Sequence, residues 1–230
     1  PAMVIVDTEV IAEANERYLV AGMGDAMATW YEARICLNNP QALTPIGARP
    51  TLASCAMGEV CAHTLLEHGE AATRAVVANV CDESLERVVE ANTLLSGIGF
   101  ESGGLALAHP MALAFTQIDR IHHNYLHGEM VAMGTLIQLV MEASKDTDKI
   151  ARFFARVGLP VHMDQLSLSP KATDALDTII EFALKNKNAH YMPMPVTAAS
   201  LREAMLNAND LGLKISAELG DDAYRRVQGL

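Results

Sequence analysis

Apolar residues recur at every third or fourth position from about residue 20 onward, which is the spacing of one face of an α-helix. A loop with three prolines, residues 38–50, interrupts the pattern, and Asp146, Ser169 and Thr197 stand where N-caps are expected. The pattern predicts helices over residues 20–37, 51–68, 70–79, 83–98, 127–144, 147–157, 170–187, 197–210 and 211–228.

Residues 3–6, "MVIV", are the one segment with a convincing strand pattern. Asp7 or Thr8 can cap a helix that begins with "EVIAEANERY" directly after it. A lone strand leaves its backbone N–H and C=O groups without partners, so we expect it to pair in an oligomer or with a sheet outside this chain. The sequence therefore predicts an all-α, multi-helical bundle with one short N-terminal strand.

Composition and charge narrow the possible partners. The chain has 230 residues, half of them apolar, which is enough for a substantial core in one folded body. Its 17 basic and 28 acidic side chains give a formal net charge of −11, which opposes binding to nucleic acid or to an anionic membrane surface. No lysine precedes Lys145 and no arginine lies between Arg87 and Arg120, so a phosphorylated substrate would find few cations there.

The cysteines and the apolar segments predict the compartment. No two cysteines form a C-x-x-C pair, which favours reduced core thiols over disulfides or a zinc knuckle. The longest apolar stretch, residues 92–115, is interrupted by a glutamate, a glycine pair and a proline, and the N-terminus lacks the pattern of a signal peptide. We expect a soluble, cytoplasmic protein. The four cysteines are Cys36, Cys55, Cys61 and Cys81.

The stretch "VAGMGDAMATW", residues 20–30, contains two glycines one residue apart. A dinucleotide-binding loop needs a preceding strand and a third glycine, whereas here a helical segment precedes and Met27 takes the third position, which argues against such a loop. Asp25 follows the glycines and precedes a nearly apolar run, so its carboxylate needs compensation. One explanation is a position at a helix N-terminus, where backbone N–H groups accept the charge.

Histidines suggest a second explanation. His109 precedes Pro110, which is tolerated at the start of a helix, and His127 stands before another apolar helical segment. Two imidazoles at helix starts and one carboxylate are the ligand types of a catalytic zinc ion with one open position. His123 and His127, four residues apart, could instead be a ligand pair on one helix, while His122 and His123 could simply be solvated loop residues.

Several motifs at these residues make the chain similar to the carboxy-terminal, metal-binding part of glycerol dehydrogenases, in the iron-containing alcohol dehydrogenase superfamily. The match runs nearly from end to end, in order and at the family's spacing. It is carried by "MVIVDTEVIAEA", "LVAGMGDAMATWYEAR", "LLEHGEAA", "ERVVEANTLLSGIGFESGGLALAH", "HHNYLHGEMVAMGTLIQLVME" and "VGLPV", and more faintly by "HYMP" and "NDLG".

The resemblance implies that Asp25, His109 and His127 are the three metal ligands and the catalytic centre. Thr29 stands where many iron-dependent relatives have a further histidine, which favours a zinc site. The implied mechanism is chelation of two neighbouring polyol hydroxyls by Zn²⁺ and transfer of a hydride from C2 to NAD, with glycerol oxidised to dihydroxyacetone. After His109 the family's usual His, Asn and Gly are replaced within residues 110–114, which suggests a different or less polar alcohol.

The same resemblance implies a division of the chain. Residues 1–16 would be the strand and linking helix that end a missing α/β dinucleotide-binding domain, and residues 17–230 the helical metal-binding domain of a homo-oligomer. Most of the NAD site would then lie outside this chain. Two other hypotheses are a truncated, non-catalytic metal-binding or oligomerisation remnant, and a related polyol or polyol-phosphate dehydrogenase; the lack of cations noted above counts against a phosphate.

Overall fold

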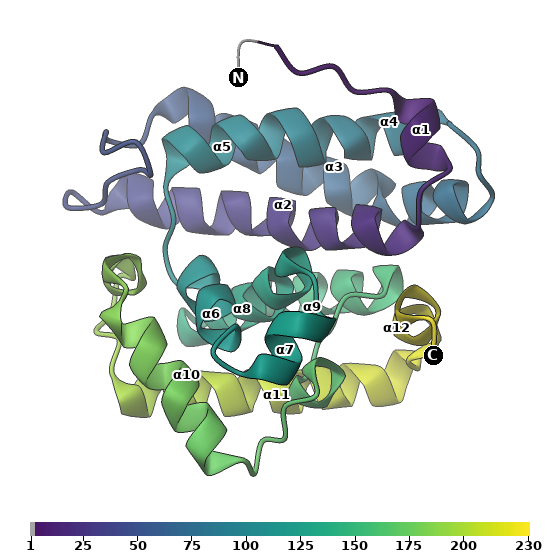
Figure 1. The fold of residues 1–230 in the computed structure, drawn as a ribbon. Coiled ribbons are helices and arrows are strands. Elements are labelled where there is room, and N and C mark those ends of the chain that lie inside the picture. Colours follow the sequence, from purple (N-terminus) through teal and green to yellow (C-terminus); the bar gives the residue numbers. More distant parts are fainter. Residues whose placement is uncertain (1–2) are drawn as a thin grey trace.

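Two layers of helices make up the computed structural model, which describes residues 3–230 (Figure 1). In the view of Figure 1, α1 to α5 form the upper layer and α6 to α12 the lower one. In chain order the elements are α1 (Thr8–Ala12), α2 (Glu16–Asn38), α3 (Leu52–Val77), α4 (Glu83–Glu90), a π-helical segment (Ala91–Leu95), α5 (Ser96–Gly103), α6 (Ala108–Phe115), α7 (Asp119–Asn124), α8 (His127–Met141), α9 (Thr147–Val157), a 3₁₀ turn (Met163–Leu166), α10 (Thr173–Lys185), a second 3₁₀ turn (Lys187–Tyr191), α11 (Ala198–Leu219) and α12 (Asp222–Gln228).

Helix α2 lies on the side of the upper layer that faces the lower one, and it packs on α3 and α5 on one side and on α8 on the other. It begins where the Asn15 side chain accepts a hydrogen bond from the Arg17 N–H at 2.9 Å, and it continues for 23 residues. Most of its length is buried, because both layers cover it. Side chains on α2 can therefore contribute to a site between the layers.

Glycines let the backbones of α2 and α8 meet. A Cβ atom at Gly128 would lie 1.8 Å from the carbonyl oxygen of Ala21, and one at Gly24 would lie 2.4 Å from the carbonyl oxygen of Gly128. Both distances are far shorter than any normal carbon–oxygen contact. The two helices can cross this closely only because both positions lack a side chain.

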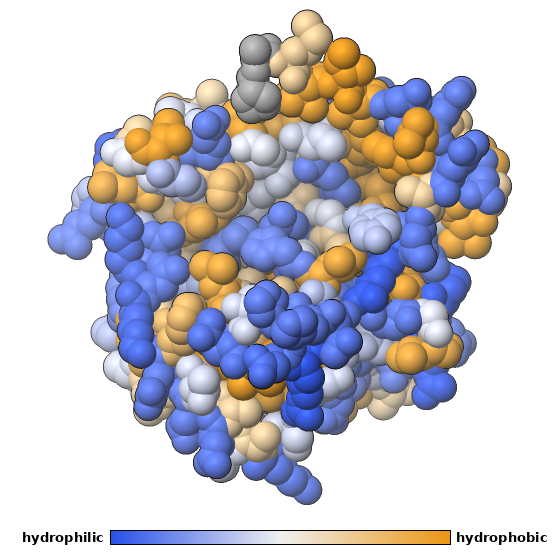
Figure 2. Space-filling model, viewed as in Figure 1, coloured by the Kyte–Doolittle hydropathy of each residue, from blue (hydrophilic) through white to orange (hydrophobic). Residues whose placement is uncertain are grey.

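The all-α prediction is confirmed for residues 3–230, but the predicted strand at residues 3–6 is absent. A strand needs a neighbour for its backbone hydrogen bonds, and none lies beside this segment among the described residues. Its side chains are open to solvent, with Met3, Val4 and Ile5 exposed by 76%, 67% and 85%. Figure 2 shows these apolar side chains gathered at the top of the molecule.

Several predicted boundaries were wrong for local reasons. The helices predicted over 51–68 and 70–79 are one helix, α3, because Gly69 does not end it but lets α3 approach the ring of Phe153. The helix expected from residue 9 breaks after Ala12 and resumes at Glu16, where Asn15 provides a new cap.

Other boundaries lie near the predicted ones. The helix predicted over 83–98 continues through the π-helical segment into α5. Thr197 caps α11 as predicted, but Ser169 does not cap α10, which begins at Thr173. The predicted break at residue 211 is absent, since α11 continues to Leu219.

The cysteines and the apolar helices can be compared with the predictions from composition within the described residues. All four cysteines are free; Cys36, Cys55 and Cys61 are buried, as expected of core thiols, whereas Cys81 is only half-buried. Within residues 3–230, no helix is both long enough and apolar enough to cross a membrane.

Candidate metal centre

Three residues predicted from the sequence meet between the layers. Asp25 comes from the middle of α2, His109 from the first turn of α6, and His127 is the first residue of α8. One ligand atom from each lies within 4.8 Å of the others. The Asp25 Oδ1 atom lies 3.2 Å from His109 Nε2 and 3.8 Å from His127 Nε2. Two imidazole nitrogens and a carboxylate oxygen converging in this way can hold a divalent metal ion.

Asp25 is not at a helix terminus. It lies well inside α2, so the explanation that backbone N–H groups at a helix start neutralise it is wrong. Gly22 and Gly24 are also inside α2, which agrees with the rejection of a phosphate-binding loop. The close crossing of α2 and α8 at Gly24 brings His127 next to Asp25.

Two buried side chains fix the start of α6. The Oε1 atom of Gln138 accepts hydrogen bonds from the N–H groups of Leu107 and Ala108, at 3.0 and 3.1 Å. The Oε1 atom of Glu32 accepts from those of Ala106 and His109, at 2.9 and 3.1 Å. The first N–H groups of a helix have no acceptor within the helix, and the oxygen atoms of these two side chains take that place. These hydrogen bonds hold the backbone of His109 in place.

Glu32 is the functional residue that the sequence analysis missed. Its side chain is fully buried, and its Oε2 atom is paired with Nδ1 of the His109 ring. A carboxylate behind a metal-ligating histidine is a common arrangement, because it fixes the orientation of the ring and increases its basicity. The available signal was spacing: Glu32 follows Asp25 by seven residues, which places both on one face of α2.

The hydrogen bond from His109 to Glu32 leaves two acceptor atoms facing one another. An ionised carboxylate only accepts, so the Nδ1 atom of His109 carries the hydrogen that is donated to Glu32. In a neutral ring Nε2 then presents a lone pair to Asp25 Oδ1, another acceptor, at 3.2 Å. Two facing acceptors repel one another unless a proton or a metal ion lies between them. The donor set therefore fits a metal, although histidine protonation alone also satisfies this pair.

The pKa shifts follow from the same charges. Burial disfavours the charged ring, but Glu32 and Asp25 outweigh this and raise the pKa of His109 to about 10. Burial would raise the pKa of Asp25, but its hydrogen bond to His109 and the charges of both histidines lower it overall. Burial lowers the pKa of His127, which favours the neutral ring that a metal requires.

A cavity of about 430 Å³ opens beside the three residues. The Thr29 and Ser96 hydroxyls in its wall are hydrogen-bonded to one another at 3.1 Å. Among the described residues that line it, none is lysine or arginine. The lining consists of Asp25, Thr29, Asn92, Ser96, Gly97, Phe100, Leu105, His109, Leu113 and His127.

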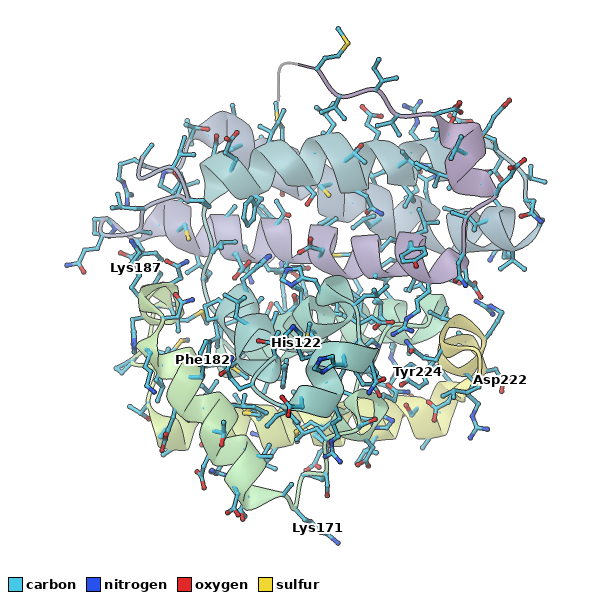
Figure 3. The ribbon with its side chains drawn as sticks, in the orientation of Figure 1. His122, Lys171, Phe182, Lys187, Asp222 and Tyr224 are labelled. Atoms are coloured by element: carbon cyan, nitrogen blue, oxygen red, sulfur yellow. The ribbon has the colours of Figure 1, made fainter. Side chains whose placement is uncertain are left out.

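The remaining histidines of this region do not join the site. His122 and His123 lie on α7 and are exposed, as expected of solvated residues, although they are helical rather than in a loop. Figure 3 labels His122 on this helix. Helix α7 ends at Asn124, so His123 and His127 belong to different helices, and the alternative ligand pair on one helix is wrong.

Known proteins resemble this chain over most of its length. No protein-family model matches the chain. The chain is 43% identical over 221 residues to glycerol dehydrogenase of Escherichia coli O6:H1, covering 95% of this chain and 60% of that protein. The structure of glycerol dehydrogenase from Schizosaccharomyces pombe superposes with a TM-score of 0.88 at 32% identity, over 96% of this chain and 57% of that one. This chain is a homologue of the glycerol dehydrogenases.

Other relatives of this glycerol dehydrogenase homologue differ in their named activity. Glycolaldehyde reductase of Halobacterium salinarum is 40% identical over 218 residues, covering 94% of this chain and 59% of that protein. The iron-containing alcohol dehydrogenase of Thermococcus thioreducens, at 18% identity, shares the fold with a TM-score of 0.63 over 90% of this chain and 54% of that one. The chain spans about 60% of the length of the curated glycerol dehydrogenases that it matches.

Proposed function

We propose that this chain provides the metal centre of a zinc-dependent, NAD-linked polyol dehydrogenase that oxidises glycerol to dihydroxyacetone. In the overall reaction, C2 of glycerol loses a hydride to NAD and the C2 hydroxyl loses a proton. The observation that carries the proposal is the convergence of Asp25, His109 and His127 at the wall of a cavity. Homology to glycerol dehydrogenases supports the choice of reaction.

Asp25 Oδ1 and the Nε2 atoms of His109 and His127 would hold the ion. Zinc bound there supplies Lewis acidity, which lowers the pKa of an alcohol hydroxyl. Glu32 keeps the Nδ1 hydrogen of His109 in place, so that the Nε2 lone pair stays turned toward Asp25. The cavity walls receive the carbon chain of the polyol and limit the access of water to the reacting carbon.

Two features support zinc and an uncharged polyol. Thr29, one helical turn after Asp25, is hydrogen-bonded to Ser96 and offers no imidazole to the site. One carboxylate and two neutral imidazoles leave a divalent ion with a net positive charge, which preserves its acidity. The described residues that line the cavity include no lysine or arginine, which disfavours the alternative of a polyol phosphate.

The chain covers 60% of the glycerol dehydrogenase that it matches, so the binding of NAD and the formation of an oligomer are proposed from the resemblance. We infer that NAD binds mostly to residues outside those of this chain. Residues 1–16 would join that part to a metal-binding domain of residues 17–230, and the assembled protein would be a homo-oligomer.

Metal analysis of the purified chain tests the first half of the proposal. We expect one zinc ion per chain, and the Asp25→Asn variant, which keeps the shape of the side chain, to lose it. A wild-type chain that binds no zinc at neutral pH would refute the metal centre. Titration with NAD then tests whether most of the NAD site lies outside this chain. If it does, the isolated chain should bind zinc but not NAD. Normal glycerol turnover by the isolated chain would disprove this division of the two sites.

A further inference from the structure

A second buried carboxylate, Glu129, lies two residues after His127 in the first turn of α8. Its side chain is 1% exposed, and it is ionically paired with Arg17 of α2. The Arg17 Nε and Nη2 atoms each donate to one carboxylate oxygen at 2.8 Å, which makes the pair bidentate. A bidentate pair fixes the relative orientation of its two elements more strictly than a single contact.

The other bonds of Glu129 and Arg17 reach three further segments near the start of α8. Its Oε2 atom accepts from the N–H of Leu126, at 2.7 Å, which ties down the residue before His127. Its Oε1 atom accepts from the Nε2 amide of Gln228, at 2.6 Å, on the C-terminal helix α12. Arg17 Nη2 also donates to the carbonyl oxygen of Asn124, at 2.7 Å, at the end of α7. In Figure 3, Tyr224 marks α12 on this side of the molecule.

None of these hydrogen bonds ends on the side chain of Asp25, His109 or His127, but they hold the segments on either side of His127. His127 is the first residue of α8 and about half-exposed, and its ring has no hydrogen-bonded anchor comparable to that of His109 among the described residues. What holds its backbone is the close contact at Gly128 on one side and the Glu129 network on the other.

We propose that Glu129 is a positioning residue of the metal centre, which holds His127 in place through Arg17, the Leu126 N–H and Gln228. The inference rests on the proposed function, because it matters only if His127 binds a metal. It also assigns a role to α2 as a whole: Arg17, Asp25 and Glu32 follow one another at intervals of about two turns, so one helix carries a ligand and the anchors of both histidines. Helix α12 stabilises the site from a distance through Gln228.

Zinc affinity of the full chain, measured by competition with a chromophoric chelator, tests the role of Glu129. Glu129→Gln keeps the size of the side chain but removes its charge, and we expect zinc affinity to fall by about tenfold or more, as for other outer residues that orient a ligand. The visible absorption of the Co²⁺-loaded chain should change as well, because it reports the geometry of the ligands. Gln228→Leu should reduce zinc affinity in the same direction by a smaller factor.

Arg226→Ala is the matched control. Arg226 lies on α12 two residues before Gln228 and pairs with Glu16 of α2 at the surface, at 3.1 Å, so its removal takes away one ion pair of α12 and leaves the bond between Gln228 and Glu129 in place. We expect wild-type zinc affinity and an unchanged cobalt spectrum. Folding of each variant is checked by circular dichroism, and Gln228→Leu replaces Glu129→Gln if the latter does not fold.

Zinc affinities and cobalt spectra distinguish a positioning role of Glu129 from a merely structural one and from the absence of a metal centre. A folded Glu129→Gln or Gln228→Leu variant with a lower melting temperature but with wild-type zinc affinity and cobalt spectrum would show that the network is merely structural. Equal losses of affinity in Gln228→Leu and Arg226→Ala would overturn the specific role of the network. A wild-type chain that binds neither Zn²⁺ nor Co²⁺ would instead refute the proposed function, and this inference with it.

Discussion

Replacing Gly128 by alanine tests the contact that brings His127 to Asp25. The added Cβ would lie 1.8 Å from the carbonyl oxygen of Ala21 and 2.6 Å from its carbon, and real Cβ contacts are not shorter than 3.0 Å. Because the obstructing atoms are backbone atoms of α2, no side chain can rotate away. The two helices must therefore separate at the point where the metal centre is assembled.

The expected magnitude follows from this geometry. Overpacking of a core costs about 1–3 kcal/mol when side chains can adjust, and a backbone clash should cost about 3 kcal/mol. That is a large part of the 5–15 kcal/mol that is typical of a domain, and it corresponds to a shift of roughly 1 M in a urea midpoint. Ligand positions tolerate errors of only about 0.2 Å, so zinc affinity should fall by tenfold or more.

Urea denaturation followed by circular dichroism, together with zinc competition, measures both effects. Gly97→Ala is the matched control: a Cβ at Gly97, in α5, meets nothing within 4 Å, so this change should stabilise the protein by about 0.5–1 kcal/mol. A Gly128→Ala variant with a wild-type midpoint and wild-type zinc affinity would refute the argument that the crossing of α2 and α8 assembles the site.

Three further predictions address other parts of the structure. Zinc at a free concentration of 100 times Kd should stabilise the wild type by about 2.7 kcal/mol and so raise its melting temperature in calorimetry, and should leave that of Asp25→Asn unchanged. Gln138→Leu should cost about 2–4 kcal/mol in urea denaturation, because it leaves the Leu107 and Ala108 N–H groups and the Tyr31 carbonyl unpaired; a loss below 1 kcal/mol would contradict this. Burial outweighs the charge of Arg34 and raises the pKa of Glu142 to about 7, above its value in the unfolded chain. The folded state therefore binds more protons than the unfolded state, and the free energy of unfolding should fall as pH rises from about 5 to 7. Denaturation at several pH values should show this slope reduced in Glu142→Gln, and parallel profiles would disprove it.

Helix positions were predictable from the sequence where the apolar pattern was long and the caps were clear. The segment 147–157 was predicted with its observed bounds, and Thr197 caps α11 as expected. Gly69 shows the limit of such reasoning, because a glycine inside a helix can mark either a break or a close contact. Only the packing of Phe153 against that position decides between them.

The candidate site was predictable in part. Resemblance to a family named Asp25, His109 and His127, and the structure brings them together. Glu32 was missed because its role depends on a contact with His109, which is 77 residues away in the chain. The spacing of seven residues from Asp25 places Glu32 on the same face of α2, but the linear sequence does not show that its side chain is buried opposite an imidazole.

The arrangement of anchors along α2 also limits how this chain can change in length. Each residue turns an α-helix by about 100°. Insertion or deletion of one residue between Arg17 and Glu32 would therefore rotate part of the set away from its partners, whatever residue is inserted. Substitutions on the outer face of the helix leave this angular register intact. The metal centre therefore tolerates many substitutions in α2, but it does not tolerate a change in the number of residues between its anchors.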